Sequence, residues 1–287
     1  MPSLIDLRRR IRSVKNTQQI TKAMKMVAAA KLRRAQERVL AARPFSQTYE
    51  KLLGDIVGAA ATDERVANHP LLAVRPERHV QLIVMTSDRG LAGAFNSNLI
   101  KGAVNFLKDK ETSAKVQLET VGRKGNGFFK RRNVTISGEH FGIFDKALYA
   151  DADRIAKTAM ERYANSEVDA VYLLYNEFKS VMSQKLTIKR ILPVEVPEGR
   201  VTLDYIFEQP PDVLLGNLLP NYVSNMVFQA VLESAAAEHA ARMVAMDAAS
   251  TNASKVIEQL TLYLNRVRQA SITREIIEVV SGAAALE

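Results

Sequence analysis

Apolar residues recur at helical spacing at both ends of the chain. In the N-terminal segment they alternate three- and four-residue steps, the repeat of a helix that packs along one side. The repeat comprises Leu4, Leu7, Ile11 and Val14, and it resumes at Leu32, Ala35, Val39 and Ala42. Between these groups, the positions that continue the repeat hold polar residues. Apolar residues lie beside those positions instead, at Ile20, Met24 and Val27. We predict one helix over Ser3–Arg43, which lacks Gly and Pro, with a buried stripe that shifts midway and a break or kink at Pro44.

The C-terminal segment has the same character. Asn221–Ser281 contains neither Gly nor Pro, which predicts a second long helix. Its apolar repeat comprises Val256, Leu260, Tyr263, Val267 and Ala270. Such a helix would be on the order of 90 Å long, more than this chain can bury alone. If the two terminal helices pair, each stripe finds a partner and they form a long antiparallel coiled coil.

The middle of the chain alternates between short apolar runs and helical patterns. The runs that predict strands are Val80–Thr86, Val116–Val121, Val171–Tyr175 and Lys185–Leu192, and the helical patterns are Phe95–Leu107 and Asp145–Tyr163. This alternation predicts an α/β body with a partly parallel sheet. A proline-containing connection, Pro193–Pro211, then leads to the C-terminal helix. We expect three parts: a helix and connection at 1–70, the α/β body at 71–210, and a helix at 211–287.

Positive charge is concentrated at the N-terminal end. The chain has a net charge of +9, and residues 1–43 hold twelve Lys and Arg against two acids. This asymmetry predicts a polyanionic or acidic partner. Nucleic acid is one candidate, but the first aromatic residue is Phe45, so the basic segment has no ring on which a base could stack. An acidic protein partner is a second explanation of the charge, and a merely solvated helix face is a third.

Few residues of this chain are suited to catalysis. There is no Cys, which excludes disulfides, thiol nucleophiles and cysteine zinc sites. The four His residues form no metal-ligand spacing, so neither a metal nor a cofactor is expected. No GxSxG motif is present, and no apolar run reaches about 18 residues. We therefore expect a chain that is not itself an enzyme and does not insert into a membrane.

Two glycine-containing segments follow predicted strands. Ser87–Gly93 reads SDRGLAG, and Gly122–Gly125 reads GRKG. Phosphate-binding loops occupy such places, but neither segment completes a GxGxxG or GKS/GKT motif. Tight turns that need glycine, with solvated basic side chains, are the alternative explanation for both.

Several segments resemble the gamma subunits of F-type ATP synthases of bacterial type. They are Ile11–Met24 (IRSVKNTQQITKAM), Arg242–Met246, Asn265–Ala270 and Ile272–Ala283 (ITREIIEVVSGA). Ser87–Gly93 also matches the usual SDRGLCG of that family except at Ala92. The resemblance covers nearly the whole chain. The cysteine-bearing regulatory insert of chloroplast relatives has no counterpart, so thiol control is not expected.

The resemblance implies a rotor. In that family the paired terminal helices pass through a ring of three alpha and three beta subunits. The Rossmann-like α/β body sits outside the ring with the epsilon subunit, on the membrane c-ring. Nucleotides bind at alpha–beta interfaces, which implies rotary coupling of ion flow to ATP synthesis without a catalytic site in this chain. The resemblance starts within the first few residues, so we expect no presequence and a peripheral position at the cytoplasmic face of a bacterial inner membrane.

The same resemblance implies which residues contact the stator. It places Lys22, Met24 and Lys25 near acidic loops of the beta subunits. The loop containing Ala92 would lie at the lower rim of the ring. A further polar contact zone on the shaft would comprise Arg242, Arg268, Gln269, Thr273 and Glu275.

Overall fold

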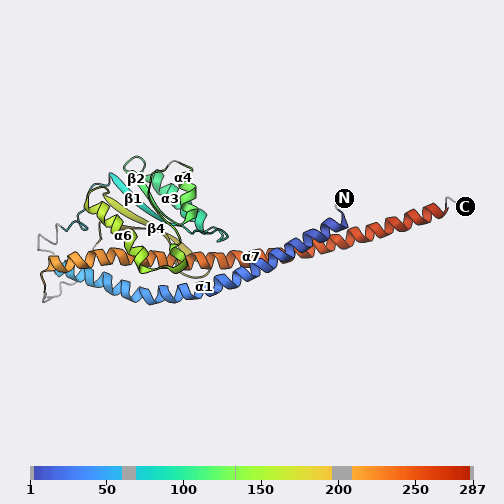
Figure 1. Ribbon diagram of the computed structural model, residues 1–287, viewed down its shortest axis with the longest axis horizontal. Coiled ribbons are helices and arrows are strands. Elements are labelled where there is room, and N and C mark those ends of the chain that lie inside the picture. Colours follow the sequence, from blue (N-terminus) through green and yellow to red (C-terminus); the bar gives the residue numbers. More distant parts are fainter. Residues whose placement is uncertain (1–2, 60–68, 133, 196–208, 285–287) are drawn as a thin grey trace. The chain divides into compact units, whose positions relative to one another are not determined.

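The computed structural model describes residues 3–59, 69–132, 134–195 and 209–284. Helices α1 (Leu4–Ala59) and α7 (Pro211–Ala284) stand at the two ends of the sequence, with a five-stranded sheet and shorter helices between them (Figure 1). Contacts group the chain into two units, which we call the helical unit (up to Ala28, and from Met243) and the α/β unit (Ala29–Arg242). The three-part division at 70 and 210 stays a prediction. The connections expected there fall largely on 60–68 and 196–208, outside the described residues.

The α/β unit is built on one mixed sheet. Its strands are β1 (His79–Met85), β2 (Lys115–Val121), β3 (Ile136–His140), β4 (Ala170–Phe178) and β5 (Gln184–Leu192). Their order is β3-β2-β1-β4-β5, with the first four parallel and β5 antiparallel to β4. Six of the seven residues of β1 are buried, as expected for the central strand of a sheet covered on both faces. The predicted α/β body with a partly parallel sheet is confirmed.

Short helices cover the sheet. They are α3 (Phe95–Lys110), α4 (Arg123–Lys130), α5 (Ile143–Lys146) and α6 (Tyr149–Ala164). Figure 1 shows α3 and α4 on one side of the sheet and α6 with α7 on the other. The single helix expected over Asp145–Tyr163 is wrong, because Ala147 adopts a left-handed conformation with φ of 47° and separates α5 from α6. The sequence analysis also missed β3, which is half-buried and contains Gly138, and α4, whose two internal glycines hide its helical pattern.

Within the α/β unit, α7 is buried on nearly all sides. Every residue from Val231 to Ala240 is buried. Four alanines in this stretch, Ala235, Ala236, Ala237 and Ala240, are at most 3% exposed, which allows close approach of other elements. The helix begins at Pro211, ten residues before the stretch without Gly and Pro that starts at Asn221. Pro220 is accommodated inside it, where the burial of Leu215 and Leu219 supports the preceding turns.

Of the break or kink expected at Pro44, the break is wrong, because α1 continues to Ala59. Tertiary contacts on the far side of the proline outweigh the lost hydrogen bond. The Tyr49 ring stacks on Tyr222 with centroids 6.3 Å apart, and the Asn225 amide donates to the Ser46 hydroxyl at 3.0 Å. Leu53 is fully buried.

In the helical unit, α1 and α7 pair as an antiparallel coiled coil. The Lys25 ammonium lies 2.6 Å from the Asp247 carboxylate, and the Gln18 amide donates to the Ser254 hydroxyl at 2.6 Å. A step of seven residues down α1 therefore matches a step of seven residues up α7. That is the heptad repeat of a coiled coil running in opposite directions.

The buried stripe of α1 does not shift midway, contrary to the expectation from sequence. Residues of one frame are buried or half-buried throughout the helical unit, namely Leu4, Leu7, Ile11, Val14, Gln18, Thr21, Lys25 and Ala28. The predicted shift rested on three apolar residues, and two of them, Ile20 and Val27, are exposed, at 59% and 58%. The seam stays in register because polar side chains that bond across it replace apolar ones.

The C-terminal stripe was displaced by one position at three of its five members. Val256, Tyr263 and Ala270 are exposed. The inward-facing residues recur in steps of four and three, and they are Ala253, Ile257, Leu260, Leu264, Val267 and Ser271. The predicted stripe alternates the same steps in the opposite order, so the two stripes share only Leu260 and Val267.

Burial of His239 in the α/β unit makes stability depend on pH. The residue is 7% exposed on α7, and this burial lowers the pKa of its imidazole, although the neighbouring Glu238 carboxylate opposes the shift. The unfolded chain takes up a proton near pH 6.5, whereas the folded chain resists protonation. Stability from this group is therefore complete above about pH 6.5 and is lost as the pH falls below it.

We predict that a His239→Gln variant loses the pH-dependent part of the stability that His239 contributes. The thermal midpoint of the parent chain should fall between pH 8 and pH 5.5 by more than that of the variant, measured by circular dichroism. Equal falls in the two proteins would show that His239 does not contribute.

Candidate functional site

A polar layer interrupts the seam of the coiled coil in the helical unit. The Lys25–Asp247 pair joins α1 to α7, with the two side chains 43% and 56% exposed. Gln18 and Ser254 form the next polar contact, one heptad away. Because polar groups at seam positions pair only in the correct alignment, they fix the register of the helices. Lys25, expected to face an acidic stator loop, is thus already paired within the chain.

Two other predicted contact residues lie beside this layer. Lys22 is exposed, and Met24 is half-buried. No ion pair of Lys22 occurs among the described residues, so its ammonium is available to an outside partner. Nearby exposed apolar side chains, Ile20, Met26 and Val27, give this part of α1 a mixed surface. A contact here would combine one cation with apolar area.

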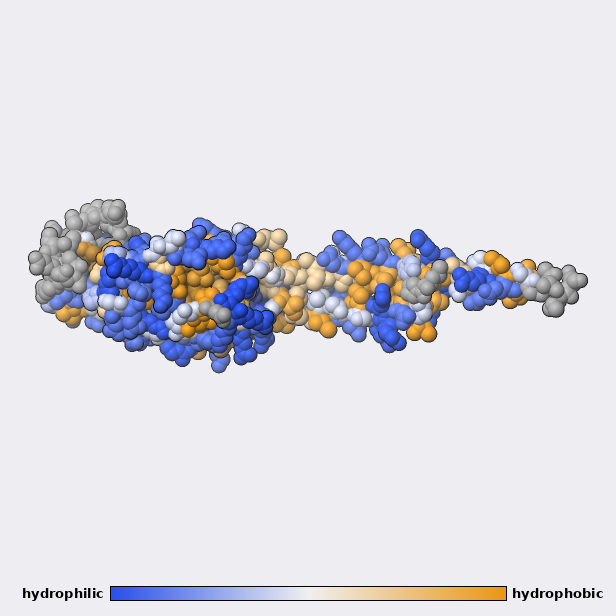
Figure 2. Space-filling model, turned by 90° about the horizontal axis from the view of Figure 1, so that it is seen from above, coloured by the Kyte–Doolittle hydropathy of each residue, from blue (hydrophilic) through white to orange (hydrophobic). Residues whose placement is uncertain are grey.

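The last part of α7 is exposed all around. Counted along the Lys25–Asp247 register, Leu4 lies level with Arg268, so α1 offers no described residue opposite those that follow. Arg268, Gln269, Thr273 and Glu275 are exposed, and only local bonds form there, such as Ser271 hydroxyl to Glu275 at 3.2 Å. Exposed apolar residues share the segment, namely Ile272, Ile276, Ile277, Val279 and Val280. Figure 2 shows apolar and hydrophilic surface mixed along this helix. Such a surface suits a partner that surrounds it.

The loop Ser87–Gly93 is fixed to its surroundings at the carboxyl end of β1. The Asp88 carboxylate accepts from the backbone N–H of Arg123 at 3.1 Å and of Gly142 at 2.8 Å. The N–H of Ser87 donates to the Asn96 side-chain oxygen at 3.0 Å. Gly122 is required beside it, since its φ is 88° and a Cβ there would lie 2.1 Å from the Thr86 carbonyl oxygen. Gly93, with a φ of 54°, and Gly122 therefore serve tight turns, one in each motif.

Ala92 does not offer a contact surface. It is 2% exposed, whereas its neighbour Leu91 is 64% exposed at a φ of 66°. Leu91 and Arg89, and not Ala92, are the side chains that this loop presents outward.

Arg242 secures this loop from α7. Its guanidinium donates to the Gly90 carbonyl at 3.2 Å and to the Glu238 carboxylate at 2.6 Å, and its side chain is 13% exposed. A mostly buried guanidinium with two acceptors has little left for a partner. The structure therefore separates Arg242, which organises the α/β unit, from the exposed residues Arg268–Glu275.

The sequence analysis missed a buried polar cluster around Glu119 on β2. The carboxylate is 1% exposed and bonds to Gln81 on β1, to the His140 ring at 2.6 Å and to Arg162 on α6 at 3.3 Å. The cluster ties three parallel strands to one helix, which is a structural task. Its signal in the sequence was a glutamate inside an apolar strand, LETV, which indicates a buried partner.

Neither a metal site nor a membrane span emerges from the structure. Across the described ranges, no three His, Cys, Asp or Glu side chains are grouped to hold a metal ion. Within the same ranges, no helix combines the length and apolar character needed to cross a membrane.

The sequence is similar to known proteins along its full length. A family model described as ATP synthase matches residues 3–286. The ATP synthase gamma chain of Solibacter usitatus (strain Ellin6076) is 60% identical over 287 residues, covering 100% of both chains. That of Anaeromyxobacter sp. (strain Fw109-5) is 50% identical over 291 residues, again covering 100% of both.

Solved structures are similar in fold. A chain of the Euglena gracilis mitochondrial ATP synthase (OSCP/F1/c-ring, rotational state 3) matches with a TM-score of 0.66 and 22% identity, covering 99% of this chain and 94% of its own. A second match is the Euglena gracilis rotor in rotational state 1, with a TM-score of 0.65, 22% identity and coverage of 94% and 98%. A chain of the Tetrahymena thermophila central stalk/cring matches at 0.58 and 24% identity, covering 80% and 99%.

The polar layer yields a testable prediction for the paired helices. Lys25→Glu sets two carboxylates against each other, so the helical unit should unfold at lower urea concentration. An exposed pair is worth about 0.2–1 kcal/mol, so the loss should be of that size. Adding Asp247→Lys to the Lys25→Glu variant restores an opposite-charge pair and should recover most of the lost stability. Helix content by circular dichroism measures both variants, and a double variant no more stable than Lys25→Glu would contradict the pairing.

Proposed function

The chain belongs to the ATP synthase gamma-chain family and is thus a central-stalk subunit of an F-type ATP synthase; from this premise we propose that its paired helices act as the drive shaft. In this proposal the shaft turns inside a ring of three alpha and three beta subunits. Its rotation couples ion flow through the membrane sector to ATP synthesis or hydrolysis at the alpha–beta sites. The alternative of a basic nucleic-acid-binding protein has no support in the family.

The observation that carries this proposal is the exposed end of α7. Beyond Arg268 the helix presents apolar and polar side chains in every direction, with no described residue of α1 opposite them. A helix of this kind needs a partner that surrounds it. A ring of subunits would bury the apolar side chains while leaving the polar ones to slide past matching groups.

We assign contact roles to residues by their exposure. Lys22 and Met24 would meet acidic loops of the beta subunits, where opposite charge favours the encounter. Arg268, Gln269, Thr273 and Glu275 would form the upper polar contacts. Lys25 would act through Asp247 by holding the register of the shaft, and Arg242 by holding the loop at Gly90. Leu91 takes the place of Ala92 as the outward contact of that loop.

The chain would be non-catalytic and peripheral. No constellation of catalytic side chains was found by sequence, and the buried cluster at Glu119 has a structural explanation. The epsilon subunit and the c-ring are the proposed partners of the α/β unit. The bacterial relatives favour the cytoplasmic face of the inner membrane as its location.

A reversible covalent tie tests the rotor proposal. The chain contains no Cys, so Leu91→Cys introduces its only thiol, at an exposed position. The variant is assembled with alpha and beta subunits that carry one cysteine on the facing acidic beta loop and no other exposed thiol. A disulfide requires Cα atoms within about 7 Å. Its formation should abolish ATP turnover and ion pumping, and reduction should restore both.

The matched control is Leu91→Cys with a cysteine-free beta subunit, which should stay active under oxidation. Full turnover with the disulfide quantitatively formed would reject rotation. Failure of the disulfide to form would reject the assigned position of Leu91.

A further inference from the structure

A cavity of about 870 Å³ opens between α3, α4 and the loop after β1. Its lining comes from Gly90–Gly93, from the α3 residues around Asn96 to Val104, and from α4 and the two residues that follow it. The volume is in the range of small-molecule sites, which span roughly 300–1,000 Å³. It lies at the carboxyl ends of the adjacent parallel strands β1 and β2, the side of such sheets where ligands bind. Apart from the loop that carries Leu91, none of the residues assigned to stator contacts lines this cavity.

The lining is strongly cationic. It contains Lys101, Arg123, Lys124, Arg131 and Arg132 and no acidic residue. Arg123 is engaged with the Asp88 carboxylate at 3.9 Å. The other four form no ion pair with any residue in the part of the chain that the structure describes. Four cations without counter-charges around one recess produce a positive potential that attracts an anion.

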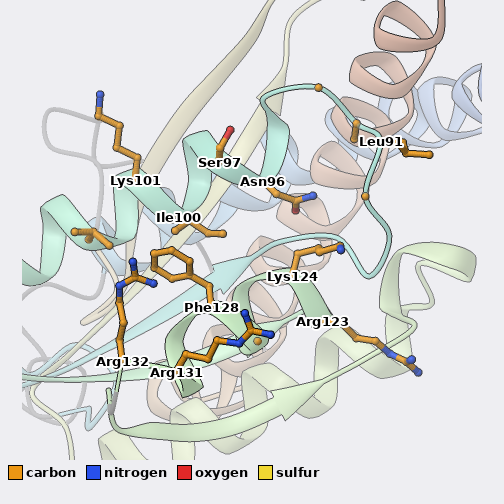
Figure 3. A pocket seen from close by; sticks show the side chains of 15 residues that line it. Leu91, Asn96, Ser97, Ile100, Lys101, Arg123, Lys124, Phe128, Arg131 and Arg132 are labelled. Atoms are coloured by element: carbon orange, nitrogen blue, oxygen red, sulfur yellow. The ribbon is translucent and has the colours of Figure 1, made fainter. Parts of the chain in front are cut away.

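Two of these cations are positioned by the fold. The backbone N–H of Lys124 donates to the Ser87 carbonyl at 3.1 Å, and its ammonium reaches toward the loop at Gly90. Figure 3 shows Arg132 beside the Phe128 ring and Arg131 extending toward the side of Arg123. The Arg132 guanidinium stacks 3.7 Å above that ring, which fixes its plane and leaves its N–H edges free.

The loop adds backbone donors. Within the described chain, no hydrogen bond uses the N–H groups of Leu91, Ala92 or Gly93. Leu91 and Gly93 have positive φ angles of 66° and 54°. Successive free N–H groups in such a turn favour a phosphate oxygen. An apolar wall of Ile100, Val104 and Phe128 stands opposite and suits an organic group attached to the phosphate.

We propose that this α3–α4 pocket binds a small phosphate-bearing anion, of the size of a diphosphate or an organic phosphate. Guanidinium groups match phosphate oxygens in pairs, and Lys124 supplies a point charge at the loop. A nucleic-acid strand is disfavoured because Phe128 is the only aromatic ring in the lining. The phosphate could be that of a free metabolite or that of a lipid headgroup, since both present the same oxygens.

The test uses the full chain, free of nucleotide, titrated calorimetrically with pyrophosphate. We expect saturable binding at one site that weakens as salt is added. Lys124→Gln with Arg131→Gln removes two charge-assisted contacts and should weaken binding by about tenfold or more. The matched control is Lys185→Gln with Lys189→Gln, which removes the same charge from exposed positions on β5 and should bind as the parent does. Unchanged thermal midpoints establish that all variants fold.

A second arm separates the two sources of phosphate. Sedimentation with phosphatidylcholine vesicles containing phosphatidylglycerol tests the lipid headgroup. Vesicle binding that depends on Lys124 and Arg131, together with weak pyrophosphate binding, assigns the lipid. Pyrophosphate binding without vesicle binding assigns the free anion. No binding in either arm, or an equal loss in the control pair, overturns the proposal.

Discussion

The two terminal helices depend on each other because neither can bury its apolar seam alone. In the helical unit the pairing of α1 with α7 resolves this over the range in which both helices are present. The seam there is kept in one heptad frame by Gln18 and Lys25, which bond to Ser254 and Asp247. Where α1 has no described residue opposite, α7 exposes Ile276 and Val279. This unpaired segment is the part of the helical unit that a surrounding partner would bury.

Sequence periodicity predicted the elements better than their faces. The two long helices were predictable because long stretches of them lack Gly and Pro, and four strands of the sheet because each is a short apolar run between polar segments. The seam was misplaced at Gln18, Thr21 and Lys25 because a rule that counts apolar residues cannot see a polar pair across an interface. A break at Pro44 was likewise considered, since the contacts of Tyr49 and Ser46 that hold α1 beyond it come from residues more than 170 positions away.

The candidate site shows the same limit. The resemblance singled out Ala92 and Arg242 by their place in family motifs, but the exposure of a side chain depends on packing. Ala92 is buried, and the Arg242 guanidinium donates to the Gly90 carbonyl and the Glu238 carboxylate. Lys22, Arg268, Gln269, Thr273 and Glu275 are exposed, as a contact role requires. The basic pocket was visible in the sequence only as two separate glycine motifs, because their closeness results from the parallel pairing of β1 with β2.

The central claim is that this chain turns as a whole relative to the alpha–beta ring. The most direct measurement attaches a fluorescent rod to Lys185→Cys on the exposed face of β5, in complexes fixed to a surface through their beta subunits. The account predicts continuous rotation of the rod in one direction while ATP is hydrolysed, stopping when ATP is withdrawn. Steady ATP hydrolysis by complexes whose rods stay still would contradict it.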